Sequence, residues 1–309
     1  MKITANFTKY RGLKHRYRRI NKITSEWNLT KIHPLITTYK IPNDFFEDFK
    51  TYIKLYISKA LKIEFDKNDK LFVKSIDGAR KNRVNITPNG AVVPKREFQL
   101  EYNLILRSWC DLFRKITVNN PRLLKLFRIT PNIRIKFGKE LKDNLNRKLS
   151  TSYPHSDAWL EGPWGMNCFI PLFGDTKKNN LRYHVPKSKF SESFLKRSPS
   201  YKDMQWVIKY YRTLNKLIPK PGLVYISDYA TLHNSFRKNN CGTRVSVDTT
   251  IIVGNHLPNK DRMKEYTPKI PFIGIDEFIE AGQSEIDKPA EKMSTHSHYT
   301  SKVLKTIKF

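Results

Sequence analysis

The chain has 309 residues, of which 39% are hydrophobic and 12% aromatic, a composition typical of a folded globular protein. No apolar run approaches the roughly 18 residues that a membrane-spanning helix requires. The N-terminus lacks the apolar segment of a secretory signal. The spacings of Cys110, Cys168 and Cys241 fit no zinc motif, so we expect free thiols in a cytoplasmic protein without a membrane span.

The net charge of +30 is the most unusual feature of the composition, with 58 lysines and arginines against 28 acidic residues. Two interpretations stay open. Lysine, asparagine and isoleucine are all abundant, as an AT-rich genome would give, or the excess serves a nucleic acid or another anionic partner. The basic run between Arg11 and Arg19 is interpreted either as an arm that contacts phosphates or as a solvated terminus.

The first part of the chain is predicted to be helical. Apolar residues recur at helical spacing from Asn43 to Leu61 and over 95–118, and Asn119, Asn120 and Pro121 end the second pattern. We therefore assign residues 1–130 to a basic N-terminal arm and supporting helices.

Strand patterns dominate the next part, residues 131–256. The predicted strands cover 132–138, 164–173, 181–185, 222–227, 231–236 and 244–253, and one helix is expected over 201–217. Several short strands with one insertion predict a mainly β fold with flanking helices, namely a double-stranded β-helix (jelly roll, cupin-like). Residues 257–309 are predicted to be a C-terminal extension of the same compact domain, which packs back on the core or contributes to a homo-oligomer.

Three residues in the strand-rich part have the chemistry of a metal site. His155 and Asp157 are separated by one residue, so an extended 153–159 segment would point both side chains to the same face. His233 supplies a second imidazole downstream. Two histidines and one carboxylate form the facial triad of non-heme Fe(II) oxygenases, which leaves coordination positions open.

Two further residues suit an organic co-substrate. Arg244 follows His233 by 11 residues, and its planar guanidinium is suited to a bidentate pair with the distal carboxylate of 2-oxoglutarate. Ser246 shares the face of Arg244 on an extended strand, so its hydroxyl is placed for the same carboxylate. With Fe(II), 2-oxoglutarate and O₂, this set predicts an enzyme that oxidises a C–H bond, with His155, Asp157 and His233 as its catalytic metal ligands.

The order His155-Ser156-Asp157, His233 and Arg244-Val245-Ser246 resembles the pattern of the Fe(II)/2-oxoglutarate-dependent dioxygenases. The surrounding segments 167–172 and 221–228 resemble the branch related to phytanoyl-CoA dioxygenase. Segment 181–189 resembles that branch's Pro-Gly-Ser-His turn, with Lys187 and Lys189 in place of the glycine and the histidine.

The segments 153–159 and 161–172 are most similar to oxygenases of bacterial carbohydrate clusters, such as a streptomycin-biosynthesis hydroxylase. The resemblance implies hydroxylation, or another C–H oxidation, of a sugar, a nucleotide-sugar or a similar small molecule. Related halogenases lack the carboxylate ligand, so the presence of Asp157 favours hydroxylation.

Other side chains are candidates for the surroundings of the site. Asn167 is expected to hydrogen-bond 2-oxoglutarate or substrate. Trp159, Trp164 and Tyr183 are expected to contact substrate, although aromatic residues also form the walls of sites. Arg134 is either a substrate anchor or a solvent-facing cation.

One other histidine and one aspartate could also belong to the site. His184 is the rival metal ligand, but no arginine follows it at a suitable distance, so we interpret it as a strand or pocket residue. Asp228 either orients a ligand or caps a turn.

Two other functions remain as alternatives. The first is a 2-oxoglutarate oxygenase that acts on nucleic acid, which the charge of +30 would favour. The second is a non-catalytic jelly-roll binding protein whose histidines and aspartate are incidental.

Overall fold

The computed structural model describes residues 11–81, 85–128, 131–138 and 147–254, together with the backbone of three short C-terminal strands. The proposed extension 257–309 therefore lies largely outside the described residues. The helices are α1 (Arg11–Glu26), α2 (Asn43–Leu61), α3 (Asp69–Gly78), α4 (Gln99–Thr117) and α5 (Ala158–Glu161). The 3₁₀ segments are η1 (Ala79–Lys81), η2 (Arg96–Phe98), η3 (Pro121–Leu123), η4 (Glu192–Leu195) and η5 (Lys202–Tyr210).

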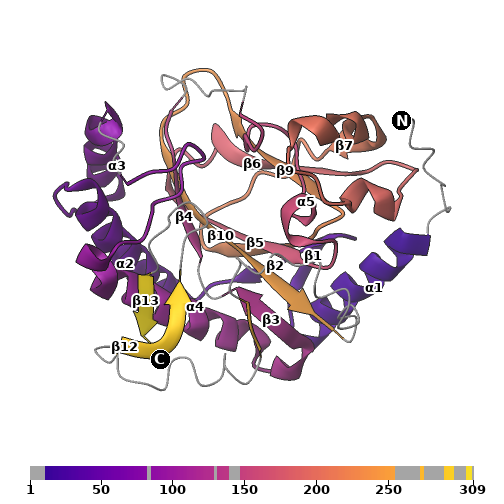
Figure 1. The fold of residues 1–309 in the computed structure, drawn as a ribbon, viewed down its shortest axis with the longest axis horizontal. Helices are drawn as coiled ribbons and strands as arrows, with labels where there is room; N and C mark the ends of the chain where they lie inside the picture. Colours follow the sequence, from indigo (N-terminus) through magenta and orange to yellow (C-terminus); the bar gives the residue numbers. More distant parts are fainter. Residues whose placement is uncertain are drawn as a thin grey trace.

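The strands are β1 (Thr30–His33), β2 (Ile36–Lys40), β3 (Leu124–Arg128), β4 (Asn132–Lys136), β5 (Met166–Gly174), β6 (Asn179–Pro186), β7 (Tyr211–Thr213), β8 (Leu223–Asp228), β9 (Leu232–Arg237), β10 (Arg244–Val253), β11 (Phe272–Gly274), β12 (Pro289–Thr295) and β13 (Leu304–Ile307). The large sheet has the order β1-β2-β8-β5-β10-β3-β11, and β4 also pairs with β10. A smaller sheet has the order β7-β6-β9, and all these pairings are antiparallel. The chain therefore has mainly antiparallel sheets with flanking helices (Figure 1).

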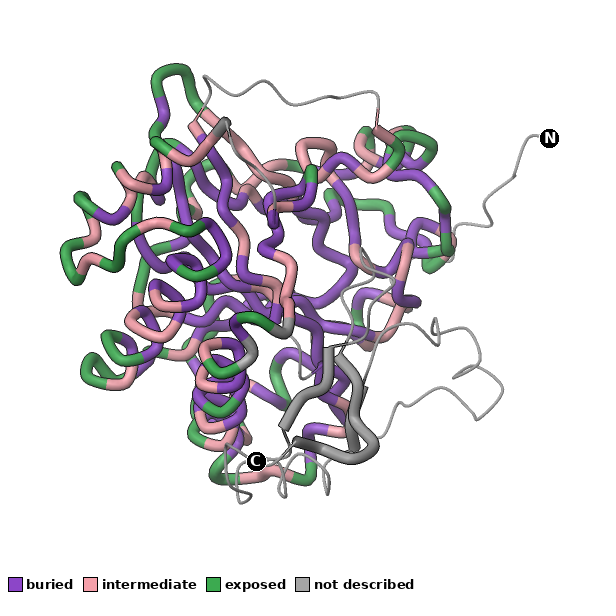
Figure 2. The backbone as a smooth tube through the Cα atoms, turned by 60° about the vertical axis from the view of Figure 1, so that its left-hand side comes forward, coloured by how far each residue is buried: buried purple, intermediate pink, exposed green. Residues whose placement is uncertain are grey.

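The two faces of the large sheet have different chemistry because side chains alternate along each strand. On β10, Val245 and Val247 join the core that α2 and α4 cover. Arg244 and Asp248 alternate with them and line a cavity on the other face. The polar residues of β10 are therefore directed at a cavity rather than at solvent, and Figure 2 shows that most of the strand interior is buried.

Aromatic side chains fill the space between the helices and the sheet. Phe49 of α2 stacks on Trp109 of α4 at 6.0 Å between ring centroids, and Trp109 also packs against Phe127 of β3. Each such aromatic residue, fully buried, contributes on the order of 1.5–3 kcal/mol to stability. The predicted helices over 43–61 and 95–118 are confirmed, and their aromatic residues pack in the core.

The prediction of a helix over 201–217 is wrong. The chain forms the 3₁₀ segment η5 and then the short strand β7, which pairs with β6. Met204 and Val207 are buried at three-residue spacing, which a 3₁₀ segment satisfies as well as an α-helix. Pairing with β6 then favours extended backbone from Tyr211.

The N-terminal basic run, interpreted as a phosphate-contacting arm or a solvated terminus, has two buried arginines among the described residues, Arg16 and Arg19, while Lys14 and Arg18 are exposed. The run forms the amphipathic helix α1, and Arg16 is completely buried. Its guanidinium donates to Asp228 at 2.7 Å and to Glu192 at 2.7 Å. Arg19 donates to the other oxygen of Asp228 at 3.3 Å. Asp228 therefore fastens α1 to the end of β8.

No helix among the described residues is long and apolar enough to cross a bilayer.

The buried ion pairs at Asp228 allow a test of the fold. Asp228→Ala should lower the free energy of unfolding by about 3–5 kcal/mol, because it removes the buried carboxylate that Arg16 and Arg19 share. Chemical denaturation measures this change, with the exposed Asp203→Ala as the control. Equal stability of the two variants would show that Asp228 does not fasten α1.

Candidate active site

The three predicted metal ligands come together between the two sheets. The ligand atoms of His155, Asp157 and His233 all lie within 4.8 Å of one another. The distance from His155 Nε2 to Asp157 Oδ1 is 4.0 Å, and that from His233 Nε2 to Asp157 Oδ2 is 3.8 Å. Facial ligands about 2.1 Å from one ion lie about 3 Å apart, so the three groups need to close by only about 1 Å to share an ion.

A short backbone ladder sets the position of the two histidines. The His155 N–H donates to the His233 carbonyl at 2.9 Å, and the His233 N–H donates to the His155 carbonyl at 2.8 Å. This isolated antiparallel bridge places His155 beside β9, at the edge of the smaller sheet. Two residues that are far apart in sequence therefore become direct neighbours.

The expectation of extended backbone over 153–159 is wrong beyond His155. Asp157 has φ −62° and ψ −20°, and α5 begins directly after it. The Trp159 N–H donates to the Ser156 carbonyl at 3.1 Å, which closes the turn. Asp157 thus reaches the two imidazoles through a helical turn rather than through the alternation of a strand.

Hydrogen bonds orient two of the ligands. Nδ1 of His155 is 2.8 Å from the Tyr153 carbonyl, so the proton is on Nδ1 and Nε2 keeps its lone pair for a metal. Burial lowers the pKa of His155 well below its usual value, which favours this neutral imidazole. The amide of Asn167 donates to Asp157 Oδ2 at 2.9 Å. Asn167 thus holds the carboxylate ligand, a role that its spacing in sequence did not reveal.

Arg244 is a buried cation with almost no partner. It is 1% exposed, and its Nε has no hydrogen-bond partner. One Nη donates to the Asn179 carbonyl at 3.4 Å, and the guanidinium lies over the Phe169 ring at 5.4 Å. Burial lowers the pKa of Arg244 to about 10, so it stays charged at neutral pH. A buried charge of this kind calls for an anion.

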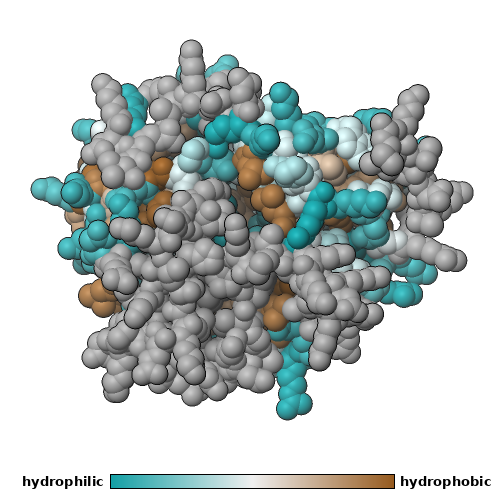
Figure 3. All heavy atoms as spheres, in the orientation of Figure 1, coloured by the Kyte–Doolittle hydropathy of each residue, from teal (hydrophilic) through white to brown (hydrophobic). Residues whose placement is uncertain are grey.

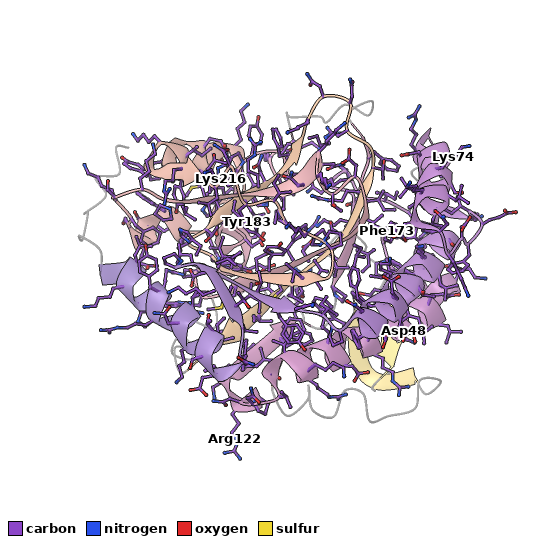
Figure 4. All side chains as sticks on the ribbon, turned by 180° about the vertical axis from the view of Figure 1, so that it is seen from behind. Asp48, Lys74, Arg122, Phe173, Tyr183 and Lys216 are labelled. Carbon is purple, nitrogen blue, oxygen red and sulfur yellow. The ribbon has the colours of Figure 1, made fainter. Side chains whose placement is uncertain are left out.

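Two hydroxyl groups near Arg244 are also buried without a hydrogen-bond partner. Ser246 Oγ and Tyr183 Oη are buried and have no hydrogen-bond partner. Ser246 follows Arg244 on the same face of β10. Burial raises the pKa of the Tyr183 phenol well above its usual value, and the nearby Arg244 charge opposes this shift. Figure 4 shows Tyr183 in the interior of the molecule. Tyr183 thus belongs with Arg244 rather than with the cavity lining, and the three groups together suit a carboxylate.

The triad opens into a cavity of about 90 Å³. Arg134 lies in its wall and forms an ion pair with Asp248 through Nε, and its Nη2 is 3.1 Å from Asp248 Oδ2. Arg128 donates to Glu161 at 3.1 Å in the same wall. Arg134 therefore faces the cavity rather than solvent.

The two tryptophans do not reach this cavity. Trp159 is 1% exposed, and its Nε1 donates to the Phe194 carbonyl at 2.7 Å. The turn at Asp157 directs it into the core on the other side of α5. Trp164 lies beside Arg16, at 5.6 Å, and its carbonyl accepts a hydrogen bond from Arg19. Their predicted contact with substrate is not supported by this arrangement.

Sequence reasoning missed Tyr201. Its ring stacks on His155 at 4.2 Å and it lines the cavity, but no motif linked it to the triad. Gly165 lies in the segment 161–172, and no sequence motif indicated a role for it. A side chain there would meet the Tyr229 ring at 2.4 Å, so glycine is needed for Tyr229 to pack beside the site.

His184, the alternative metal ligand, uses both ring nitrogens in hydrogen bonds outside the triad. Its Nδ1 is 2.9 Å from Thr213 Oγ1, and its Nε2 is 2.9 Å from Asn234 Oδ1. It lies next to Tyr183, on the opposite face of β6, and is therefore a strand residue.

No family model and no curated protein matches the chain. Among solved structures, it is similar to the non-heme α-ketoglutarate-dependent carbocyclase SnoK from nogalamycin biosynthesis, with 12% identity, 84% of this chain and 93% of that chain covered, and a TM-score of 0.39. AviO1 from Streptomyces viridochromogenes Tue57 has 12% identity, coverages of 78% and 96%, and a TM-score of 0.38. An N-substituted L-amino acid dioxygenase from Burkholderia ambifaria AMMD has 12% identity, coverages of 77% and 88%, and a TM-score of 0.35. The sequence identities and TM-scores are too low to define a family, so the proposed function rests on the residues of the site itself.

The triad should bind one divalent cation per chain. We expect His233→Ala and Asp157→Ala to lower the affinity for Mn(II) or anaerobic Fe(II) by at least about 100-fold, because each removes a ligand. Calorimetric titration measures it. His184→Ala is the control and should bind the ion as wild type does. Unchanged affinity in His233→Ala would place the metal elsewhere.

Proposed function

We propose that the protein is an Fe(II)- and 2-oxoglutarate-dependent oxygenase that hydroxylates, or otherwise oxidises a C–H bond of, a carbohydrate-like molecule. One observation carries the proposal. A triad with the chemistry of the facial Fe(II) site lies in the same cavity as a buried arginine that lacks an anion. A purely structural metal site would have a full set of protein ligands, and a structural arginine would have a protein carboxylate as its partner.

The residues divide the work between two ends of the cavity. His155, Asp157 and His233 would hold Fe(II), and Asn167 would fix the orientation of the carboxylate ligand. Arg244, with Ser246 and Tyr183 beside it, would bind the distal carboxylate of 2-oxoglutarate. With Fe(II) and 2-oxoglutarate bound, the site would use O₂ to oxidise a C–H bond of the substrate.

We interpret the two antiparallel sheets as the double-stranded β-helix predicted from the sequence. The position of the triad between the sheets, with the arginine at the start of β10, supports this interpretation. Assignment to the phytanoyl-CoA dioxygenase branch rests on the sequence resemblance. The buried free thiols Cys110, Cys168 and Cys241 agree with a reducing compartment such as the cytoplasm. A homo-oligomer remains a prediction.

The co-substrate pocket predicts a spectroscopic result. Anaerobic protein with Fe(II) and 2-oxoglutarate should show the weak visible charge-transfer band of the ternary complex. Arg244→Ala should raise the Kd for 2-oxoglutarate by at least about 30-fold, since a buried hydrogen-bonded charge pair is worth roughly 2–5 kcal/mol. Tyr183→Phe and Ser246→Ala should raise it by smaller factors. The exposed Arg212→Ala is the control.

Two outcomes would contradict this assignment. Absence of the band in folded, Fe(II)-loaded wild type would remove 2-oxoglutarate from the proposal. An equal Kd in wild type and Arg244→Ala would place the distal carboxylate at another residue.

The charges of the cavity indicate the class of substrate. Arg128 is paired with Glu161, and Arg134 is paired with Asp248. Arg244 is assigned to 2-oxoglutarate, so each arginine in the cavity lining has a partner. The rest of the lining includes Asn89, Asn132 and Thr151, which offer amide and hydroxyl groups. A neutral group rich in hydroxyls, such as a sugar ring, suits this surface better than a phosphate.

This charge pairing predicts substrate preference. Succinate formation should rise with neutral polyhydroxylated compounds, including the sugar part of nucleotide-sugars, more than with compounds oxidised next to a phosphate or a carboxylate. Asp248→Asn removes the partner of Arg134 and adds one positive charge, so it should shift the preference toward anionic analogues. A wild-type preference for anionic groups, unchanged in Asp248→Asn, would refute a neutral substrate.

A further inference from the structure

One part of the molecule combines many basic residues with very few acidic ones. Strands β6, β7 and β9 with η4 and η5, residues 177–220 and 232–238, form what we call the basic lobe. It contains fourteen lysines and arginines, but only Glu192 and Asp203 as acids. Residues 43–78, which form α2 and α3, contain seven basic and seven acidic residues. An AT-rich genome would enrich lysine in both segments, but it would not remove the acids from one of them.

The charges of the basic lobe are available to a partner. Twelve of the fourteen basic residues are exposed. Glu192 is already bound to Arg16, which leaves Asp203 as the only other acid of the lobe. The segments are neighbours in space, because the Lys238 N–H donates to the Lys178 carbonyl at 2.8 Å and Lys187 Nζ donates to the Lys209 carbonyl at 3.1 Å.

Figure 4 shows Lys216 of this lobe and Lys74 of α3 on opposite sides of the molecule. Hydrophilic side chains stand out over the upper right of Figure 3, where Figure 1 places β6, β7 and β9.

Aromatic side chains lie among these cations. Trp206 of η5 is 44% exposed and packs edge-on against Phe194 at 5.7 Å. On the outer face of β6 and β9, the Arg182 guanidinium lies over the Phe236 ring, 3.2 Å from its centroid. A cationic surface with accessible aromatic and guanidinium planes is the usual platform for unpaired bases. None of these residues lines the cavity of the triad.

We propose that the basic lobe binds single-stranded nucleic acid, with lysines and arginines at the phosphates and Trp206 stacked on a base. A single strand is favoured over a duplex, because only unpaired bases can stack on the exposed Trp206 ring. This binding is independent of the proposed oxidation at the triad, and it needs neither metal nor 2-oxoglutarate.

The test uses the full chain without metal and a fluorescent single-stranded oligonucleotide, with anisotropy as the readout. Binding should weaken as salt rises, with a slope of about −0.7 per phosphate contact. The triple variant Lys196→Glu, Arg197→Glu, Lys202→Glu should weaken binding by at least about tenfold and reduce the slope by about 2.

The matched control applies the same change of charge to the opposite side. Lys59→Glu, Lys67→Glu, Lys74→Glu should alter affinity by less than about threefold, since long-range effects are screened. Trp206→Ala should weaken binding by about tenfold, and Trp206→Phe should retain most of it.

Three results would overturn the proposal. Equal losses in the two triple variants would show a response to net charge alone. No binding at low salt would exclude nucleic acid, and binding of anionic lipid vesicles without oligonucleotide would assign the lobe to a membrane surface. Tighter binding of a duplex than of the strand would refute the stacking arrangement.

Discussion

The candidate site depends on the pairing of His155 with His233. Two backbone hydrogen bonds join these residues and fix both Cα positions at the edge of the smaller sheet. Everything else in the triad follows from this contact. The Tyr153 carbonyl orients one imidazole, and the turn after His155 brings Asp157 to both rings. Because the ladder consists of backbone groups, it requires no particular side chains and is set by the path of the chain.

The path of the chain depends in turn on the buried charge cluster at Asp228. This residue ends β8, its side chain accepts from the Ala230 N–H at 2.8 Å, and its carbonyl accepts from Thr231 at the entry to β9. Arg16 contacts the same carboxylate and also the Pro163 carbonyl, in the loop that follows α5. The N-terminal helix thus connects the two segments that carry the metal ligands.

Alternation along strands explains what could be predicted from the sequence. The pattern of β10 placed Arg244 and Ser246 on one face, and the strand was predicted with its correct limits. Chain order also grouped the residues of the triad correctly. Periodicity could not reveal the burial of Arg16, because its partner Asp228 is 212 residues away. It also could not show that Asp157 occupies a turn or that Trp159 points into the core, since both depend on where α5 begins.

Charge separates the two functions that we propose. Within the cavity, opposite charges are paired, so the reacting group is expected to be neutral. On the basic lobe they are unbalanced, which provides a surface for a polyanion. The net charge of the chain alone does not distinguish the paired charges of the cavity from the unbalanced charges of the lobe. The basic lobe contributes +12 (14 basic against 2 acidic residues) to the overall charge of +30, and this charge gives no information on the chemistry at the triad.

The central claim is that one cavity holds a metal at the triad and a dicarboxylate at Arg244. The most direct measurement is a crystal structure of protein grown anaerobically with Fe(II) and 2-oxoglutarate, with anomalous data at the iron edge. The account predicts an iron peak bound by His155, Asp157 and His233, and density for a dicarboxylate whose far end meets Arg244. An iron peak elsewhere, or a dicarboxylate that does not reach Arg244, would contradict it.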